Sequence, residues 1–157
     1  MKIKITKLPA AILMSLAAGA IGSMATVTGI NSWYSELIKP SFNPPNWIFG
    51  PVWTILYILM GIALYLIWQD GLKKAFVKNS FMLFIVNLVL NSFWSIAFFG
   101  MQNPALAFLV IILLWLVILT LILRFYKINK LASYLLIPYI LWVSFASVLN
   151  FSIWQLN

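Results

Sequence analysis

The chain has 157 residues, of which 64% are hydrophobic, 17% aromatic and only 8% charged. Soluble domains carry about a quarter charged residues, so this composition excludes an ordinary soluble protein and indicates an integral membrane protein. Cysteine and histidine are absent and only two acidic side chains are present, which excludes disulfides, histidine metal sites and the usual catalytic pairs, so we expect no metal and no obligatory cofactor.

Five apolar runs are long enough to cross a bilayer as helices, which takes about 20 residues each. None of them contains Asp, Glu, Lys or Arg, and the connectors between them are short. The sequence therefore predicts one all-α integral membrane domain over residues 1–157, a bundle of five transmembrane helices with a structured loop between the first two. The predicted spans are residues 8–30, 47–69, 80–101, 105–123 and 131–156.

The first run, residues 8–30, also resembles a signal peptide, because lysines precede it and small residues follow its apolar centre. Its apolar part is longer than a typical signal core, which favours a retained helix. Small residues recur in it at fourfold spacing, and such faces let helices pack closely, either within the bundle or between two copies. We favour packing within the bundle. The two rows are Ser15, Gly19 and Ser23, and Ala18, Gly22 and Thr26.

Four prolines lie in the segment KPSFNPPNWIFGPVW, residues 39–53, between the first two spans. Because proline restricts the unfolded chain, such a loop loses little entropy when it becomes ordered. We expect a proline-braced lid over one end of the bundle and a second helix that begins near Pro44 to Asn46. Pro51, about a turn further on, is predicted to kink this helix and tilt Trp53.

Nine of the ten Lys and Arg residues fall on one side of the predicted bundle, and only Lys39 lies opposite. Such residues mark the cytoplasmic side, so we expect a cytoplasmic N-terminus, an external C-terminus and an external lid. The net charge of +8 is then a topology signal with affinity for anionic headgroups, and no nucleic-acid partner is expected. The nine residues are Lys2, Lys4, Lys7, Lys73, Lys74, Lys78, Arg124, Lys127 and Lys130.

No ionisable side chain except tyrosine lies inside a predicted span. Proton-coupled transport generally requires an embedded acid, and ion channels require charged rings or a carbonyl filter, so both classes are disfavoured. Whatever the bundle does must rest on shape, aromatic surfaces and neutral hydrogen bonds.

The third span aligns four side chains on one helical face: Asn87, Asn91, Trp94 and Ser95. A lipid-facing amide would leave its donors and acceptors unpaired, so this face must point inward. Hydrogen bonding between helices and contact with a ligand explain the face equally well.

Two other spans combine large aromatic side chains with small ones, an arrangement that outlines a flat slot. The second span aligns Trp53, Tyr57 and Gly61. The fifth span aligns Pro138, Trp142, Ala146 and Asn150, and Pro138 is predicted to bend it because proline lacks the backbone N–H. The tryptophans of these faces, rather than those near helix ends, are the candidates for a pocket.

Three segments carry a resemblance to a known family: WYSELIKPSFNPPNWIFGPVWTILY, LVLNSFWSIAFF and LLIPYILWVSFASVLN. Together they resemble the translocator protein family, also called tryptophan-rich sensory proteins or peripheral-type benzodiazepine receptors. The resemblance covers essentially the whole chain and implies a five-helix bundle, usually a homodimer, in a bacterial cell membrane. It implies a pocket beneath the lid that binds porphyrins, including protoporphyrin and haem, and other hydrophobic ligands.

Carried over position by position, the resemblance implies pocket residues in the lid and in three helices, to which the helical faces add Tyr57 and Trp94. The resulting candidate ligand-binding residues are Tyr34, Pro44, Trp53, Tyr57, Asn87, Asn91, Trp94, Trp142 and Ala146. Some bacterial members of the family degrade protoporphyrin in light, and Trp53 and Trp142 match the tryptophans implicated. The cholesterol motif of animal members is incomplete here, since Phe151 and Gln155 replace its tyrosine and basic residue.

Three functions follow from this reading. The first is a receptor or sensor that binds porphyrins and other hydrophobic ligands in a tryptophan-lined pocket. The alternative is a light-dependent porphyrin-degrading enzyme, in which Trp53 and Trp142 would be the catalytic residues. The third is a passive translocator of tetrapyrroles or lipids, which the family name suggests more than any residue does.

Overall fold

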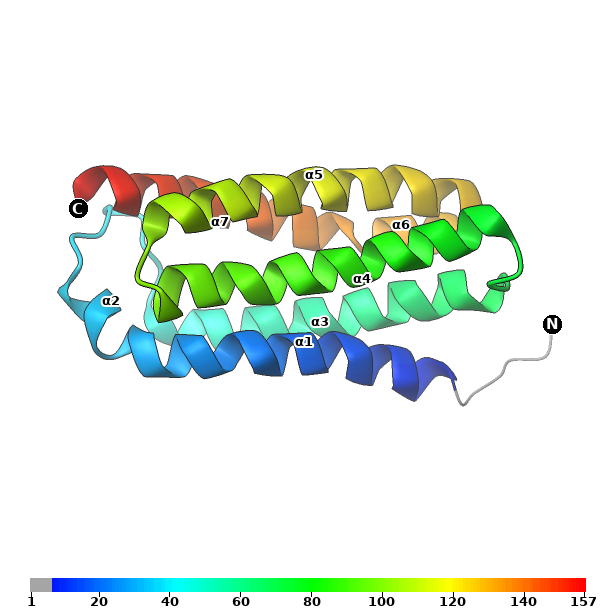
Figure 1. Cartoon of the computed structure of the whole chain (residues 1–157), viewed down its shortest axis with the longest axis horizontal. Coiled ribbons are helices and arrows are strands. Elements are labelled where there is room, and N and C mark those ends of the chain that lie inside the picture. Colours follow the sequence, from blue (N-terminus) through cyan, green and yellow to red (C-terminus); the bar gives the residue numbers. More distant parts are fainter. Residues whose placement is uncertain (1–6) are drawn as a thin grey trace.

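Five helices long and apolar enough to cross a membrane run side by side in the computed structural model, which describes residues 7–157 (Figure 1). This part of the chain contains no β-strand. The all-α membrane bundle expected from the sequence is therefore confirmed. Lys2 and Lys4, which the orientation argument counted, lie outside the described residues.

The helices follow the predicted order, with one addition in the lid and one break in the last span. The elements are α1 (Lys7–Ile30), α2 (Trp33–Glu36), α3 (Asn46–Gln69), α4 (Ala75–Ser95), the π-helical turn η1 (Ile96–Gly100), α5 (Pro104–Ile128), α6 (Lys130–Tyr134) and α7 (Ile137–Leu156). In the structure the lid is the connection between α1 and α3, residues 31–45, and it includes the short helix α2. The turn η1 continues α4 directly.

Two helices extend past their predicted spans because basic side chains are tolerated at helix ends. Helix α4 begins at Ala75 rather than residue 80, and α5 continues to Ile128 rather than residue 123. Long basic side chains can reach the membrane interface from the last turns of a helix. Arg124 also donates from Nε to Ser80 Oγ at 2.9 Å, which joins the ends of α5 and α4.

Proline and asparagine set several helix ends. Helix α3 begins directly after Pro45 and runs uninterrupted through Pro51 to Gln69. The side chain of Asn103 accepts a hydrogen bond from the backbone N–H of Leu106 at 3.0 Å and so caps α5. In the last span the helix breaks between α6 and α7, and Pro138 lies in the first turn of α7, where its missing N–H is harmless.

Part of the small-residue face of α1 packs within the bundle, while its use between two copies stays untested. A Cβ atom placed on Gly61 of α3 would lie 2.6 Å from Ile12 Cα, so the two backbones touch at this point. Ser92 of α4 donates from Oγ to the carbonyl oxygen of Ala18 at 2.8 Å. Gly22 is buried against α4 as well, with Ser95 as its nearest neighbour.

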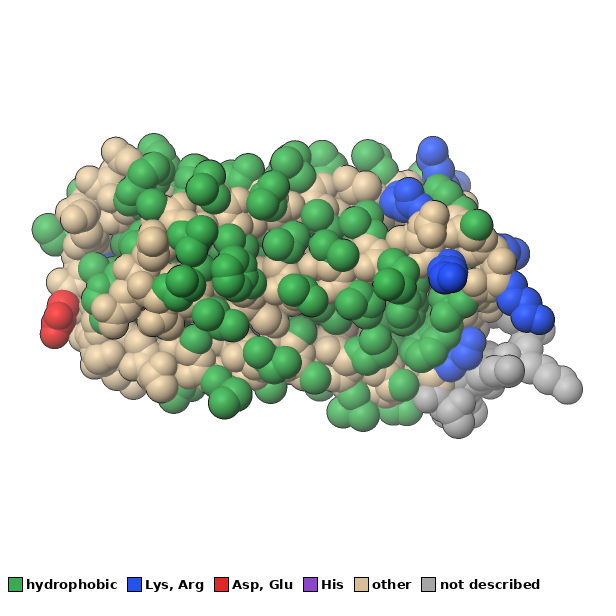
Figure 2. Space-filling view, viewed as in Figure 1, with side chains coloured by type: hydrophobic (Ala, Val, Ile, Leu, Met, Phe, Trp, Pro, Cys, Tyr) green, Lys and Arg blue, Asp and Glu red, His purple; other side chains and the backbone are tan. Residues whose placement is uncertain are grey.

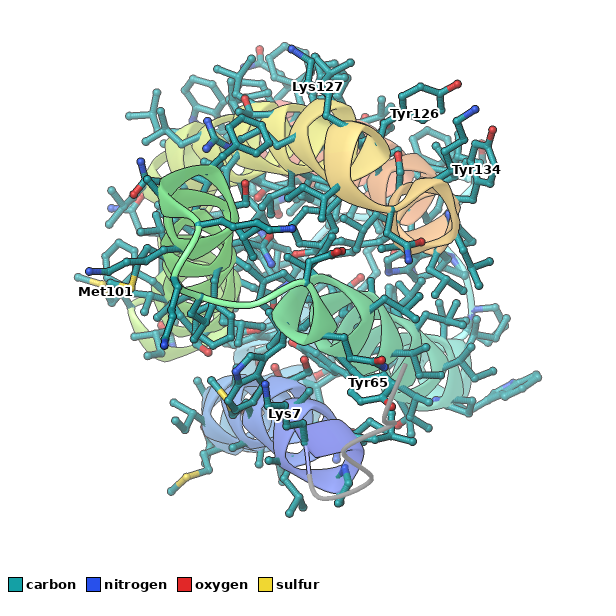
Figure 3. All side chains as sticks on the ribbon, turned by 90° about the vertical axis from the view of Figure 1, so that its right-hand side faces the viewer. Lys7, Tyr65, Met101, Tyr126, Lys127 and Tyr134 are labelled. Atoms are coloured by element: carbon teal, nitrogen blue, oxygen red, sulfur yellow. The ribbon has the colours of Figure 1, made fainter. Side chains whose placement is uncertain are left out.

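The described Lys and Arg side chains, except Lys39 in the lid, gather at the end of the bundle that carries the α3–α4 and α5–α6 connections (Figure 2). Viewed from this end, Lys7 of α1 and Lys127 of α5 lie on opposite sides of the bundle (Figure 3). The lid that carries α2 lies at the opposite end (Figure 1). This separation is what the positive-inside argument requires, while the orientation in a membrane stays a prediction.

Candidate functional site: an aromatic cavity beneath the lid

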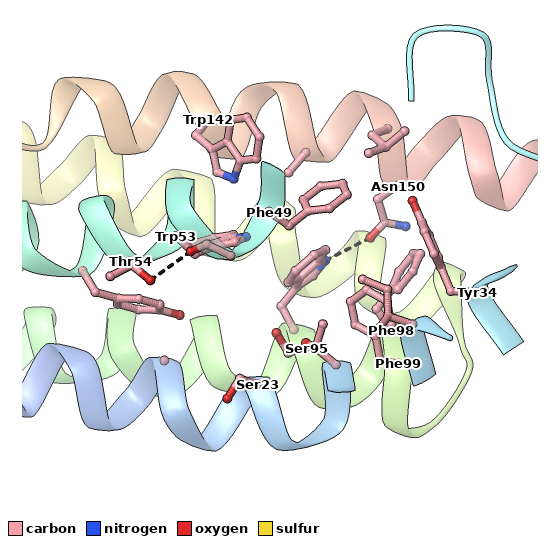
Figure 4. Close-up of a pocket in the computed structure, with 18 of the residues that line it drawn as sticks. Ser23, Tyr34, Phe49, Trp53, Thr54, Ser95, Phe98, Phe99, Trp142 and Asn150 are labelled. Atoms are coloured by element: carbon pink, nitrogen blue, oxygen red, sulfur yellow. Dashed lines mark hydrogen bonds between the residues drawn. The ribbon is translucent and has the colours of Figure 1, made fainter. Parts of the chain in front are cut away.

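A cavity of about 300 Å³ lies between α1, α3, α4 and α7, at the lid end of the bundle (Figure 4). Within residues 7–157, none of the side chains that line it carries a charge. The wall comprises Leu16, Gly19, Ala20, Ser23, Thr26, Ile30, Tyr34, Phe49, Gly50, Trp53, Thr54, Tyr57, Trp94, Ser95, Phe98, Phe99, Trp142, Ala146, Leu149, Asn150 and Ile153.

Stacked aromatic rings form one wall of this cavity. The ring centroids of Trp53 and Tyr57 lie 5.7 Å apart, with an angle of 29° between the planes. The ring centroids of Trp53 and Trp94 lie 6.3 Å apart. Trp142 faces them from α7, in edge contact with Phe49 at 6.2 Å. Aromatic faces of this kind present broad, rigid, apolar surfaces. The arrangement suits a flat apolar molecule.

Two indole N–H groups of the cavity wall differ sharply in their hydrogen bonding. Trp94 donates from Nε1 to Asn150 Oδ1 at 3.0 Å, and Asn150 in turn donates from Nδ2 to the carbonyl oxygen of Pro104 at 2.8 Å. The Nε1 atom of Trp142 is buried and has no acceptor within residues 7–157. A buried donor without a partner costs about 1–3 kcal/mol, so an acceptor brought to this atom would stabilise the structure.

Asn87 and Asn91 form a hydrogen-bonded chain next to the cavity rather than part of its wall. Tyr57 donates from its hydroxyl to Asn91 Oδ1. Asn91 donates from Nδ2 to the Tyr139 hydroxyl at 2.9 Å, and Tyr139 donates to Asn87 Oδ1 at 3.1 Å. The chain joins α3, α4 and α7 and holds Tyr57, which does line the cavity.

The lid is fixed by side-chain hydrogen bonds. Tyr34 is buried, lines the cavity and donates from its hydroxyl to Asn43 Oδ1 at 2.7 Å. Burial raises the pKa of Tyr34 to about 12, against the smaller opposing effect of this bond. The side chain of Asn157 pairs with both the N–H and the carbonyl of Ile38, at 2.9 Å and 3.0 Å. These contacts hold the lid against the end of α7.

The predicted site residues fall into two groups. Six line the cavity: Tyr34, Trp53, Tyr57, Trp94, Trp142 and Ala146. The other three do not: Pro44 lies in the lid, where its carbonyl accepts from Asn43 Nδ2 at 3.1 Å, and Asn87 and Asn91 form the chain described above. Ligand contact by any of them stays a prediction.

Several wall residues were not among the predicted site residues. Helix α1 contributes Gly19, Ala20, Ser23 and Thr26, and the π-helical turn contributes Phe98 and Phe99. The fourfold row of small residues on α1 was the available signal, since a surface without large side chains leaves room for a ligand as well as for a helix. No pattern in the sequence marked the two phenylalanines.

Five membrane-length helices, an aromatic cavity between them and a lid over one end of the bundle together define a multi-pass membrane protein with an internal cavity. The chain matches the sequence model of the TspO/MBR family over residues 11–155. It therefore belongs to the TspO/MBR family, and the resemblance seen in the sequence is confirmed.

Curated relatives agree with this assignment over most of their length. The chain is 49% identical to the tryptophan-rich protein TspO of Chlorobaculum tepidum over 144 residues, which cover 92% of this chain and 91% of the relative. It is 47% identical to the protein of the same name from Archaeoglobus fulgidus, covering 98% of both chains. It is 36% identical to the human translocator protein, covering 80% of this chain and 75% of that protein.

Proposed function

We propose that this protein is a membrane receptor or sensor that binds porphyrins and related tetrapyrroles in the cavity beneath the lid. The observation that carries the proposal is the uncharged wall of stacked aromatic rings, to which Trp142 belongs with a buried Nε1 that has no partner among the described residues. A porphyrin is a broad apolar disc that stacks well between indole rings. The acceptor atoms at its centre and rim suit the N–H of Trp142.

The size of the cavity is compatible with this ligand only if part of the macrocycle reaches the cavity openings. About 300 Å³ is at the lower limit of small-molecule pockets, which run from about 300 to 1,000 Å³. Wall residues Ala20, Ser23, Gly50 and Thr54 are exposed, so the space continues toward the bilayer between α1 and α3. The described wall offers no histidine, cysteine or methionine, and the hydroxyls of its tyrosines, Tyr34 and Tyr57, already bond to Asn43 and Asn91. This favours a metal-free porphyrin over coordinated haem.

Lys39 gives the lid end of the site its positive charge. Its Nζ lies 4.9 Å from the ring centroid of Tyr34, a wall residue, and donates to the carbonyl oxygen of Leu37 at 3.1 Å and of Ser35 at 3.3 Å. Ammonium groups attract carboxylates, and porphyrins of biological origin carry carboxylates on their rim. This charge supports binding with the acidic rim toward the lid.

The proposal also includes the membrane in which the receptor lies, its orientation there and its partners. Lys and Arg concentrate at the end opposite the lid, which supports a cytoplasmic N-terminal side and an external lid. Insertion in a bacterial cell membrane is expected from the family resemblance. A homodimer is expected from the family resemblance. Besides the porphyrin and a second copy of the chain, the protein contacts the lipid bilayer.

Replacement of Trp142 by phenylalanine should weaken porphyrin binding about tenfold, because it removes one hydrogen bond and part of the stacking surface. The measurement is a titration of purified protein with protoporphyrin, followed by quenching of tryptophan fluorescence. Trp154→Phe is the matched control, since Trp154 is exposed and does not line the cavity. Equal affinities for wild type and Trp142→Phe would contradict the role given to Trp142.

A second candidate function is the light-dependent degradation of the bound porphyrin. The observation that favours it is that Trp53 and Trp142 both line the cavity. A light-excited porphyrin is an oxidant and a source of singlet oxygen, and indole is an easily oxidised side chain. No acid–base group is required, which suits a wall without charged residues.

Illumination of the complex should bleach protoporphyrin and form a new product at a rate that depends on both tryptophans. In a variant with Trp53→Phe and Trp142→Phe, we expect the rate, measured by absorbance at saturating porphyrin, to fall to that of a detergent blank. The Trp154→Phe variant should bleach at the wild-type rate. Wild-type bleaching no faster than the blank would rule out this second function.

A further inference from the structure

The cavity wall is exposed along one line, between α1 and α3. Ala20 and Ser23 on α1 and Gly50 and Thr54 on α3 all line the cavity and are all exposed. Figure 4 shows Ser23 and Thr54 on these two helices, at the edge of the pocket. These four residues are small, so no large side chain at these positions covers the gap between α1 and α3.

The two helices touch at Gly61 and leave open space beside Gly50, nearer the lid. At Gly61 a Cβ atom would lie 2.6 Å from Ile12 Cα, and at Gly19 it would lie 2.4 Å from the Tyr57 ring. Because the helices are antiparallel, the Ile12–Gly61 pairing brings Ser23 to about the level of Gly50. At Gly50 a Cβ atom would meet nothing within 4 Å. No side chain of α1 among the described residues therefore fills the space beside Gly50.

The hydroxyl groups at this gap are already satisfied by their own helices. Thr54 donates from Oγ1 to the carbonyl oxygen of Gly50 at 2.9 Å, and Ser23 donates from Oγ to that of Ala20 at 2.8 Å. Such groups can face hydrocarbon at little cost, because no donor is left unpaired. The gap is thus compatible with a position inside the bilayer.

The route through the lid is obstructed, in contrast to the gap. Asn157 holds Ile38 by two hydrogen bonds, and Tyr34 is tied to Asn43. Phe42 packs against Phe145 of α7, with ring centroids 6.4 Å apart. Entry from water requires these contacts to break, whereas entry between α1 and α3 requires none of them to.

We propose that the cavity takes its ligand sideways from the bilayer, through a lateral portal formed by Ala20, Ser23, Gly50 and Thr54. The ligand class is then a membrane-dissolved amphiphile, with its apolar part in the hydrocarbon and its acidic groups near the lid. The proposal deepens the proposed function, and rests on it for the identity of the ligand. The route itself rests on the shape of α1 and α3.

Thiol labelling tests the route without any porphyrin. The chain has no cysteine, so Ala146→Cys places a single thiol in the cavity wall. Reconstituted protein is treated with N-ethylmaleimide, the more lipid-soluble N-hexylmaleimide, or a sulfonated, membrane-impermeant maleimide, and labelling is followed by mass spectrometry. In detergent-denatured protein all variants should label alike, which verifies that the thiol is intact.

Lateral entry predicts that N-hexylmaleimide labels fastest and the sulfonated reagent slowest. Adding Ala20→Leu or Gly50→Leu should slow labelling by N-hexylmaleimide about tenfold, since either leucine obstructs the portal. Ala17→Leu is the matched control, because Ala17 is exposed on the same helix but does not line the cavity; it should leave the rate unchanged.

Three results would overturn the portal: rates unaffected by either leucine, equal slowing by Ala17→Leu, or fastest labelling by the sulfonated reagent. A folded Ala146→Cys protein whose thiol resists all three reagents would overturn it as well. These outcomes are independent of the porphyrin proposal. Failure of wild-type protein to bind protoporphyrin contradicts the proposed function, while the labelling rates still decide the route.

Discussion

Gly61→Ala should destabilise the bundle by about 1–3 kcal/mol, the usual cost of overpacking, and lower the melting temperature by several degrees. The new methyl group would lie 2.6 Å from Ile12 Cα, an atom of the backbone that cannot rotate away. Helices α1 and α3 would have to separate along the contact that the small residues provide. Thermal unfolding in detergent, followed by circular dichroism, measures the effect.

Gly50→Ala is the control for this prediction, because it is the same substitution in the same helix. A Cβ atom at Gly50 would meet nothing within 4 Å. Alanine also has the higher helix propensity, by about 1 kcal/mol, so this variant should be unchanged or slightly stabilised. If Gly61→Ala melted at the wild-type temperature, the close contact between α1 and α3 would be wrong.

Ala146→Phe should abolish porphyrin binding while the protein stays folded. Ala146 lies in the cavity wall on α7, and a phenyl ring there would occupy space that the ligand requires. We expect a loss of affinity of about 100-fold or more, which corresponds to an overpacking penalty of about 3 kcal/mol. Co-elution of protoporphyrin with the protein in size-exclusion chromatography gives the bound fraction.

Ala17→Phe provides the matched control, because Ala17 is exposed and lies outside the cavity wall. It should retain wild-type binding. Melting curves of both variants establish that each is folded before binding is compared. Retention of porphyrin by folded Ala146→Phe would place the ligand outside this cavity.

The membrane helices could be predicted because hydropathy is a property of consecutive residues. Their ends were less predictable: Arg124 ended the predicted fourth span, yet it lies inside α5, where its side chain reaches Ser80 of α4. Such a position depends on a neighbouring helix, which composition does not reveal. The break before α7 likewise falls ahead of Pro138 rather than at it.

The sequence predicts which side chains of one helix share a face. It does not predict which of them lie in a cavity formed by several helices. Asn87 and Ser95 share a helical face but are separated by about 12 Å along the axis, at 1.5 Å per residue. The structure therefore gives the two ends of this face different surroundings: Asn87 bonds to Tyr139, and Ser95 lines the cavity. Helical periodicity in the sequence identifies the inward-facing residues. Whether each of them packs in the core or lines the cavity depends on how neighbouring helices are aligned along their axes.

The unpartnered N–H of Trp142 lies beyond sequence reasoning for the same reason. Its counterpart Trp94 finds an acceptor in Asn150, a residue of α7 that is 56 positions away in the chain. Whether an indole meets an acceptor depends on which side chains neighbouring helices bring to the same level. The most informative polar atom of the site thus becomes visible only in the assembled bundle.

The most direct test of the central claim is energy transfer from tryptophan to protoporphyrin in reconstituted wild-type protein and in Ala146→Phe. Excitation of tryptophan should produce porphyrin emission that saturates at one porphyrin per chain in the wild type and is lost in Ala146→Phe. The same emission in both proteins, rising without saturation, would show that the porphyrin lies in the bilayer and would contradict a binding site among Trp53, Trp94 and Trp142.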